Sequence, residues 1–424
     1  MLKRLALSTT MVLACAGFAE AKVEIACLTT AAHLTRQHEP LMKRFNEMQD
    51  DIVAYAAPSQ DYADTHLKLF RASATNTLPD CAFQAFNQLP SLARALDARS
   101  QIVHLDELIV KEEDGWKAAN YTERMLDLGR VDGIQYGMPF NASVIQWYYN
   151  ADLVRQAGGD PDNFPTTWDG VIELAKKIDA LGDDIASLSY AADKWGDDWP
   201  WQTLILQQGG RMLNEAGDEV AFDKNNYHVE AMKLLRRLVE EGVYDPAISQ
   251  SDQLTQFTEG KMGIYATSPA SARNTAERVG ELFDLRTTTF AVWNDAEGLL
   301  PSGGNAALIT TKDPEKVAAA WEYIKFVTGP EGQEFAAKIT GYLPTNRGAL
   351  AEDRLGGYYA AEPYYATPSN QYDRAGPWSG YPGTQSEKIW REQREVIHAV
   401  MTGRKAPEDG AREMVEIAEK LMQR

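Results

Sequence analysis

Residues 194–202, K-W-G-D-D-W-P-W-Q, carry the densest group of side chains suited to holding a polyhydroxylated molecule. Three Trp and two Asp fall within seven residues, beside a Gly and a Pro, and no helical or strand period explains them, which predicts a loop. In one interpretation the Trp side chains pack on the surface of a lobe. In the other, Trp195 and Trp199 stack on the apolar face of a sugar ring, and Asp197 or Asp198 accepts hydrogen bonds from its hydroxyls.

Polar side chains also interrupt an apolar strand that is predicted over residues 140–149, within the segment Y-G-M-P-F-N-A-S-V-I-Q-W-Y-Y-N. Strand alternation puts Asn141 and Ser143 on one face. One interpretation is the edge of a sheet with two hydrogen-bonded polar groups. The other is a strand that crosses between two lobes, with these small polar side chains facing a cleft.

Five further residues lie at positions where a ligand could bind. Tyr62 and Asn87 fall near the carboxyl ends of predicted parallel strands, where such sheets bind ligands. Ser268 precedes a Pro and is predicted to cap a helix whose free N–H groups suit a phosphate or hydroxyl. Gly304, the second of two glycines before a strand, permits close backbone approach, and Tyr342 lies in the turn T-G-Y-L-P-T-N. Packing, capping or a simple turn is the alternative explanation for each.

The elements that must position these residues follow an alternating order. Strands are predicted over residues 23–29, 52–57 and 81–86, with helices between them, which indicates a parallel sheet with right-handed crossovers. Residues 355–381 are rich in Tyr, Pro and Gly and predict loops, and two amphipathic helices close the chain. About 400 residues exceed one ordinary core, so two lobes are expected.

The amino terminus predicts export. Residues 1–21 combine Lys3 and Arg4, an apolar stretch and the cleavage signal A-E-A, which is typical of a signal peptide and of a periplasmic protein. Lipid anchoring at Cys15, in V-L-A-C, is the less favoured alternative. Cys27 and Cys81 then remain, either as a disulfide between neighbouring strands or as two buried free thiols.

Composition restricts the partners. The formal net charge of −19 disfavours nucleic acid and anionic membrane surfaces. Two distant cysteines and six scattered His predict no metal site, and no cofactor motif is found. We expect a monomer with a small-molecule ligand.

Six segments, in order, carry a resemblance that spans nearly the whole mature chain. They are Y-G-M-P-F-N-A-S-V-I-Q-W-Y-Y-N followed by F-P-T-T-W-D-G, then F-T-E-G-K-M-G-I-Y-A-T-S, P-S-G-G-N-A-A-L-I-T, F-V-T-G-P-E-G-Q-E-F and T-G-Y-L-P-T-N. Together they resemble the extracellular solute-binding proteins of ABC importers that carry sugars, and within that family the glycerol-phosphate-binding branch. The resemblance implies an α/β fold of two Rossmann-like lobes joined by hinge strands, the type 2 fold of periplasmic binding proteins.

The resemblance also implies an arrangement of lobes and a mode of action. The expected first lobe comprises residues 22–142 and 294–328, and the second comprises residues 143–293 and 329–424. A carbohydrate or polyol would bind in the cleft, the lobes would close by hinge motion, and permease subunits at the inner membrane would receive the ligand. The family's cleft residues match these positions in this chain: Tyr62, Ser143, Trp195, Trp199, Ser268, Gly304 and Tyr342.

Two departures from the glycerol-phosphate binders bear on the ligand. Their third-strand glutamate falls here near Phe86 and Asn87, and their phosphate-binding arginine falls near Trp378, with Arg374 four residues earlier. If Arg374 does not reach the cleft, Trp378 becomes a stacking surface and a neutral sugar is favoured. The alternative is glycerol phosphate or a related phosphorylated polyol.

An exported glycosidase is the main alternative of another class. Asp197 and Asp198 beside Trp could be read as its acid pair, but adjacent residues of one loop rarely flank a scissile bond. Ser268 has no marked His partner. The sequence therefore predicts no catalytic residues and a binding protein rather than an enzyme.

Overall fold

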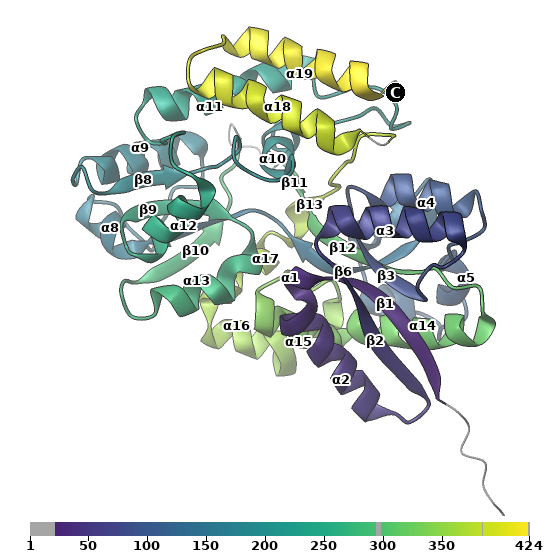
Figure 1. Ribbon diagram of the computed structural model, residues 1–424. Coiled ribbons are helices and arrows are strands. Elements are labelled where there is room, and N and C mark those ends of the chain that lie inside the picture. Colours follow the sequence, from purple (N-terminus) through teal and green to yellow (C-terminus); the bar gives the residue numbers. More distant parts are fainter. Residues whose placement is uncertain (1–21, 294–297, 384, 423–424) are drawn as a thin grey trace, which may run out of the picture.

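The computed structural model describes residues 22–293, 298–383 and 385–422. Two large sheets lie beside each other, each covered by helices (Figure 1). We call the five-stranded sheet with its helices the first lobe and the four-stranded sheet with its helices the second lobe. The predicted two-lobed α/β fold is confirmed. The signal peptide and Cys15 lie outside the described residues, and no helix within them is long and apolar enough to cross a membrane.

The first lobe is built on a mixed sheet in the order β2-β1-β3-β12-β6. Its parallel strands β1, β2 and β3 place their carboxyl ends at one edge, and β12 runs antiparallel to β3 and β6. The strands are β1 (Val23–Thr30), β2 (Ile52–Ser59), β3 (Cys81–Ala85), β6 (Gly137–Ser143) and β12 (Gly303–Ile309). The predicted alternation of strands and helices is thus confirmed here.

Helices cover both faces of this sheet. Alternate residues of β1 belong to two separate apolar clusters, Ile25 to one with α2 and α14 and Leu28 to one with α3 and α4. The helices of this lobe are α1 (Ala31–His33), α2 (Glu39–Met48), α3 (Tyr62–Thr75), α4 (Leu89–Asp97), α5 (Asp106–Ile109), α6 (Trp116–Asn120), α7 (Glu123–Asp127) and α14 (Pro314–Val327). A π-helical turn (Leu34–His38) follows α1, and β4 (Arg130–Val131) pairs with β5 (Ile134–Gln135).

The second lobe is built on a sheet in the order β10-β7-β9-β8. Its strands are β7 (Gln146–Asn150), β8 (Ala186–Ser189), β9 (Met262–Thr267) and β10 (Leu285–Thr289). Trp147 stacks on Phe290 with ring centroids 4.5 Å apart, and Trp168 meets both rings edge-on. Its helices are α8 (Ala151–Gln156), α9 (Trp168–Asp179), α10 (Trp199–Gln207), α11 (Tyr227–Glu240), α12 (Gln250–Thr258), α13 (Ala272–Val279), α18 (Ser386–Met401) and α19 (Pro407–Met422).

The chain passes between the lobes at residues 144–145. The single strand predicted over residues 140–149 is wrong, because β6 ends at Ser143 in the first sheet and β7 begins at Gln146 in the second. Both connecting residues, Val144 and Ile145, are buried. The two apolar residues between β6 and β7 suit a continuing strand, so strand periodicity alone does not mark the change of sheet.

The chain passes back from the second sheet to the first between β10 and β12, and returns after α15 (Pro330–Thr340). α15 packs against α14, and Gln333 Nε2 donates to the Phe140 carbonyl, 3.0 Å away. The predicted lobe boundaries stay a prediction. Short helices follow at residues 347–350, 352–356, 357–361 (α16), 363–365, 367–370 (α17) and 372–374, so most of the segment 355–381 that was predicted as loops is helical. β13 (Ala375–Gly376) next pairs with β11 (Leu300–Pro301).

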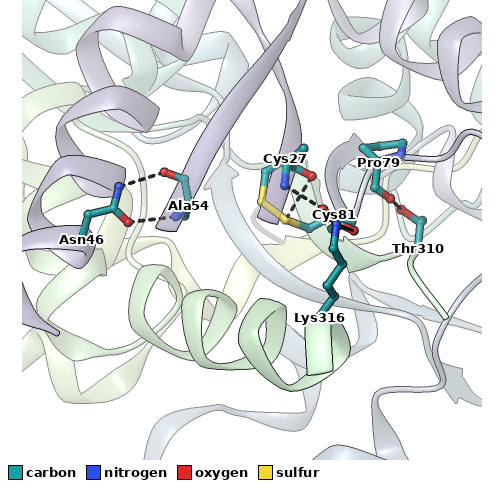
Figure 2. The surroundings of a disulfide bond; sticks show 9 residues. Cys27, Asn46, Ala54, Pro79, Cys81, Thr310 and Lys316 are labelled. Carbon is teal, nitrogen blue, oxygen red and sulfur yellow. Dashed lines mark hydrogen bonds and ion pairs between the residues drawn. A yellow bond between two sulfur atoms is a disulfide. The ribbon is translucent and has the colours of Figure 1, made fainter. Parts of the chain in front are cut away.

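A disulfide between Cys27 and Cys81 ties β1 to β3 (Figure 2). The two residues are direct partners in the parallel register, and their Cα atoms are 4.4 Å apart, within the range that a disulfide spans. Beside them, Asp80 accepts hydrogen bonds from the Ala26 N–H and from Lys316 on α14. Of the two alternatives for these cysteines, the structure therefore has the disulfide.

Candidate functional site

A cavity of about 470 Å³ opens between the two lobes. The first lobe lines it with residues at and just after the carboxyl ends of β2 and β3. The second lobe lines it from the segment that precedes α10, from α18 and from the segment between β13 and α18. Its lining residues are Asp61, Tyr62, Ala63, Ala85, Asn87, Gln88, Gly196, Asp197, Asp198, Trp378, Gly380, Tyr381, Ser386, Glu387, Trp390, Arg391 and Arg394. Three residues predicted to bind ligand, Tyr62, Asn87 and Trp378, thus meet in one cavity.

Tyr62 lines the first-lobe side of the cavity, and Asn305 of β12 contacts it from inside that lobe. Tyr62 is the first residue of α3, and Asn305 Nδ2 donates to its hydroxyl oxygen over 2.8 Å. Asn305 pairs directly with Ala85, which lines the cavity, so the two side chains lie on the same face of the sheet. Burial raises the pKa of Tyr62 to about 12, so the hydroxyl stays neutral and able to donate.

Tyr342 reaches the same group through a histidine. His33 Nε2 lies 3.5 Å from the Tyr62 hydroxyl oxygen and 3.4 Å from that of Tyr342. Burial lowers the pKa of His33 to about 4, so its ring is neutral at pH 7. The predicted pair Tyr62 and Tyr342 is therefore brought together around one neutral imidazole.

Two adjacent carboxylates form the second-lobe side. Asp198 Oδ1 accepts from Trp378 Nε1 and its Oδ2 accepts from Gln202 Nε2, each over 2.9 Å. Gln202 also exchanges hydrogen bonds with the backbone of Ser379. Asp198 therefore holds the Trp378 indole against the second lobe.

Asp197 is less engaged than its neighbour. It accepts one hydrogen bond, from the Trp199 N–H over 3.1 Å, and it lines the cavity. Burial and then the charge of Asp198 raise the pKa of Asp197 to about 7, and burial raises that of Asp198 to about 6. Neither carboxylate forms an ion pair with a basic side chain in the part of the chain that the structure describes.

Trp195 and Trp199 lie behind these carboxylates. Their ring centroids are 5.6 Å apart, and Trp199 Nε1 donates to the Pro301 carbonyl over 2.6 Å. Gly303, Ser143 and Trp199 meet where the chain changes lobe. A Cβ added to Gly303 would lie only 2.9 Å from Ser143 Oγ and 3.4 Å from the Trp199 ring. The predicted loop is wrong in its second half, because α10 begins at Trp199. Every residue of α10 is buried, which leaves no amphipathic period to detect.

Asn141 and Gly304 are placed away from the cavity lining. The Asn141 side chain exchanges two hydrogen bonds with the buried amide of Gln37, so this amide pair satisfies itself inside the first lobe. Gly304 has φ +119°, and a Cβ there would overlap the Asn141 carbonyl. The glycine is thus required by close packing of β12 on β6.

Ser268 and Arg374 are also outside the lining. Ser268 Oγ accepts from the Ala270 N–H and caps a three-residue 3₁₀ turn, as the sequence predicts. Arg374 is buried, and its guanidinium donates to the carbonyls of Phe290, Ala291 and Gly298. Arg374, the only arginine proposed from sequence as a ligand-binding residue, therefore lies at a junction of backbone segments. A role of these residues in binding stays a prediction.

Several residues at or beside the cavity were not proposed from sequence, among them His33, Asn305, Tyr381, Trp390, Arg391 and Arg394. Asn305 carries a usable signal, because it is a polar residue within the buried strand G-G-N-A-A-L-I, as Asn141 is within its own strand. Trp390, Arg391 and Arg394 carry none, since α18 has the pattern of an ordinary amphipathic helix, and Tyr381 lies among many other aromatic residues of the segment predicted as loops. Within the described residues no group of His, Cys, Asp and Glu could hold a metal ion.

Comparison with known proteins gives a consistent picture. Residues 40–382 match the family model described as bacterial extracellular solute-binding protein. The sn-glycerol-3-phosphate-binding periplasmic protein UgpB of Rhizobium meliloti is 24% identical over 359 residues, covering 82% of this chain and 80% of the relative.

Two solved structures share the fold. The sugar-binding protein MalE of Xanthomonas citri has a TM-score of 0.79 at 20% identity, covering 95% of this chain and 98% of the other. UgpB of Mycobacterium tuberculosis, solved in complex with glycerophosphocholine, has a TM-score of 0.74 at 18% identity, with 95% and 98% covered. The resemblance predicted from the six sequence segments, including the likeness to glycerol-phosphate binders, is confirmed.

Proposed function

This chain belongs to the bacterial extracellular solute-binding proteins, and from that membership we propose that it captures a carbohydrate between its lobes for an ABC importer. The observation that carries this proposal is the cavity lined from both lobes by aromatic, carboxylate and hydroxyl groups. Its volume of about 470 Å³ lies within the usual range for small-molecule sites.

The lining suits the two kinds of surface that a carbohydrate presents. Trp378, Tyr381 and Trp390 offer aromatic faces to the C–H face of a sugar ring. Tyr62 and Asp197 offer polar atoms to its hydroxyls from opposite lobes. A ligand held in this way bridges the lobes and favours their closed arrangement.

A close contact across the cavity supports closure. A Cβ at Gly380 would overlap the carbonyl oxygen of Asn87, so the two backbone segments meet without room for a side chain. Asn87 follows β3 of the first lobe, and Gly380 is held to α10 of the second lobe through Ser379 and Gln202. Ligand binding would therefore be linked to this backbone contact.

Glycerol phosphate is the second candidate ligand, favoured by the names of the UgpB relatives and by Arg391 and Arg394 in the lining. Two observations weigh against it. Arg374 is engaged with backbone carbonyls, and the interior of the cavity carries Asp197 and Asp198. We therefore place a carbohydrate without phosphate first.

We also infer that the protein is not a glycosidase. Asp197 and Asp198 are neighbours on one lobe and cannot flank a glycosidic bond from two sides. Both oxygens of Asp198 are engaged by Trp378 and Gln202. We further propose that the mature protein begins at Lys22, acts as a monomer in the periplasm and delivers its ligand to a membrane permease.

Thermal unfolding of the mature protein against sugars, polyols and glycerol phosphates tests the proposal. A ligand present at 100 times its dissociation constant adds about 2.7 kcal/mol to the free energy of unfolding. We expect a rise of the midpoint with a carbohydrate and none with glycerol phosphates. A rise with phosphorylated polyols alone would establish the second candidate instead, and turnover of glycosides would contradict both.

A further inference from the structure

Unfilled hydrogen-bond acceptors gather at the cavity. Asn305 Oδ1 and Asn87 Oδ1 are buried and accept no hydrogen bond from the described residues. The Asn305 amide nitrogen is used by Tyr62, so its oxygen is the remaining group. Asn87 lines the cavity, and Asn305 lies on the face of the sheet that carries the lining residue Ala85. Two buried amide oxygens of the first lobe therefore await donors.

The second lobe adds a charged acceptor. Asp197 accepts a single backbone hydrogen bond, although a carboxylate can accept several. Its nearest electrostatic neighbours are Asp198, which repels it, and Tyr62, whose pKa it raises from across the cavity. A negative charge at Asp197 is thus uncompensated in the ligand-free protein.

The basic side chains of the lining do not relieve this charge. Arg391 and Arg394 both lie on α18, and Arg394 donates to the Trp195 carbonyl over 3.3 Å. No ion pair joins either arginine to Asp197 within the described part of the chain. Around Asp197 the cavity presents aromatic rings instead, and the faces of such rings attract cations.

These features favour a ligand that carries hydrogen-bond donors and a positive charge. A phosphate group has acceptors only and would meet acceptors here, whereas an ammonium group has three donors and no acceptor. We propose that the captured carbohydrate is an amino sugar whose protonated amine pairs with Asp197, while its hydroxyls donate to the amide oxygens of Asn87 and Asn305. This inference rests on the proposed function and narrows its ligand class.

Isothermal titration of the mature protein at pH 7 with matched ligand pairs tests the inference. The pairs are hexoses and hexosamines of the same configuration, as mono- and disaccharides, with the N-acetyl derivatives as uncharged analogues and glycerol phosphates as the anionic series. We expect the hexosamine of a bound pair to bind about tenfold more tightly than its hexose, because a charge-assisted hydrogen bond is about twice as strong as a neutral one. N-acetylation should remove that advantage.

Variants assign the effect to one residue. D197N keeps an oxygen for the Trp199 N–H and removes the charge, and we expect it to bring the hexosamine within about threefold of the hexose. E395Q changes an exposed carboxylate of α18 that lies outside the cavity lining, and it should keep the preference. The comparison of ligand pairs uses the wild-type protein alone, so it still tests the amino-sugar assignment if D197N does not fold.

The outcomes separate the inference from the proposed function. Equal or tighter binding of neutral hexoses would overturn the amino-sugar assignment and leave carbohydrate capture intact. A preference for hexosamine that survives in D197N would overturn the role of Asp197. Binding of glycerol phosphates alone, or of no member of the three series, would overturn both proposals.

Discussion

Replacing Asp197 by Asn is predicted to stabilise the ligand-free protein at pH 8 and to change its stability little at pH 4. The pKa of Asp197 is raised from 3.8 to about 7 in the folded protein. The folded state then binds more protons than the unfolded state between these two values, so the contribution of Asp197 to stability is lost as pH rises through them. A difference of about three pKa units corresponds to about 4 kcal/mol.

Asn carries no charge, so the variant avoids this loss. We expect D197N to exceed the wild type in free energy of unfolding by up to about 4 kcal/mol at pH 8 and by less than about 1 kcal/mol at pH 4. Denaturant unfolding at pH 4, 6 and 8, followed by near-UV circular dichroism, measures both values. E395Q, at an exposed carboxylate outside the cavity lining, serves as the matched control and should follow the wild type at each pH.

The sign of the pH 8 difference is decisive. The charged groups that share the cavity with Asp197 are Asp198, Asp61, Glu387, Arg391 and Arg394. If either arginine compensated Asp197 in solution, D197N would be the less stable protein at pH 8. That result, or a difference that does not change with pH, would refute the uncompensated carboxylate.

Three further changes test other parts of the structure. Joint replacement of Cys27 and Cys81 by Ala opens a loop with a sequence separation of 54 and should cost about 4 kcal/mol of unfolding free energy; unchanged denaturant midpoints would contradict the disulfide. G380A should weaken ligand binding more than about tenfold, because its Cβ would overlap the Asn87 carbonyl and separate the two segments that meet in this structure; titration and scattering that show normal affinity and closure would contradict it. N305A should weaken binding by about tenfold, as a lost buried hydrogen bond to the ligand predicts; wild-type affinity in calorimetry would exclude Asn305 from the site.

Much of the fold was accessible from sequence because it depends on local patterns. The order of strands and helices around β1, β2 and β3 follows periodicity and caps, and the two closing helices α18 and α19 follow their apolar stripes. A crossing between lobes in the segment around Ser143 was one of the two interpretations of the sequence, but the break into two strands at Val144 and Ile145 was not accessible, because both residues suit a continuing strand. α10 was missed for the related reason that all of its faces are buried.

The cavity was predicted in part. Tyr62, Asn87 and Trp378 line it, and Asp197 and Asp198 were recognised as possible hydroxyl acceptors. The difference in hydrogen bonding between Asp197 and Asp198 was not predictable, since Asp198 accepts from the Trp378 indole, which lies 180 positions along the chain. Asn141 is a residue that was predicted to bind ligand but does not line the cavity. A polar residue in an apolar strand indicates a polar partner, but the pattern does not say whether that partner is a ligand or Gln37.

A crystal structure of the mature protein with the tightest ligand of the panel tests carbohydrate capture between the lobes most directly. We predict density for the ligand between Tyr62 and Asn305 on one side and Asp197 and Trp378 on the other, with the lobes closed upon it. Density outside this cavity, or a bound ligand that contacts one lobe alone, would contradict the proposed site.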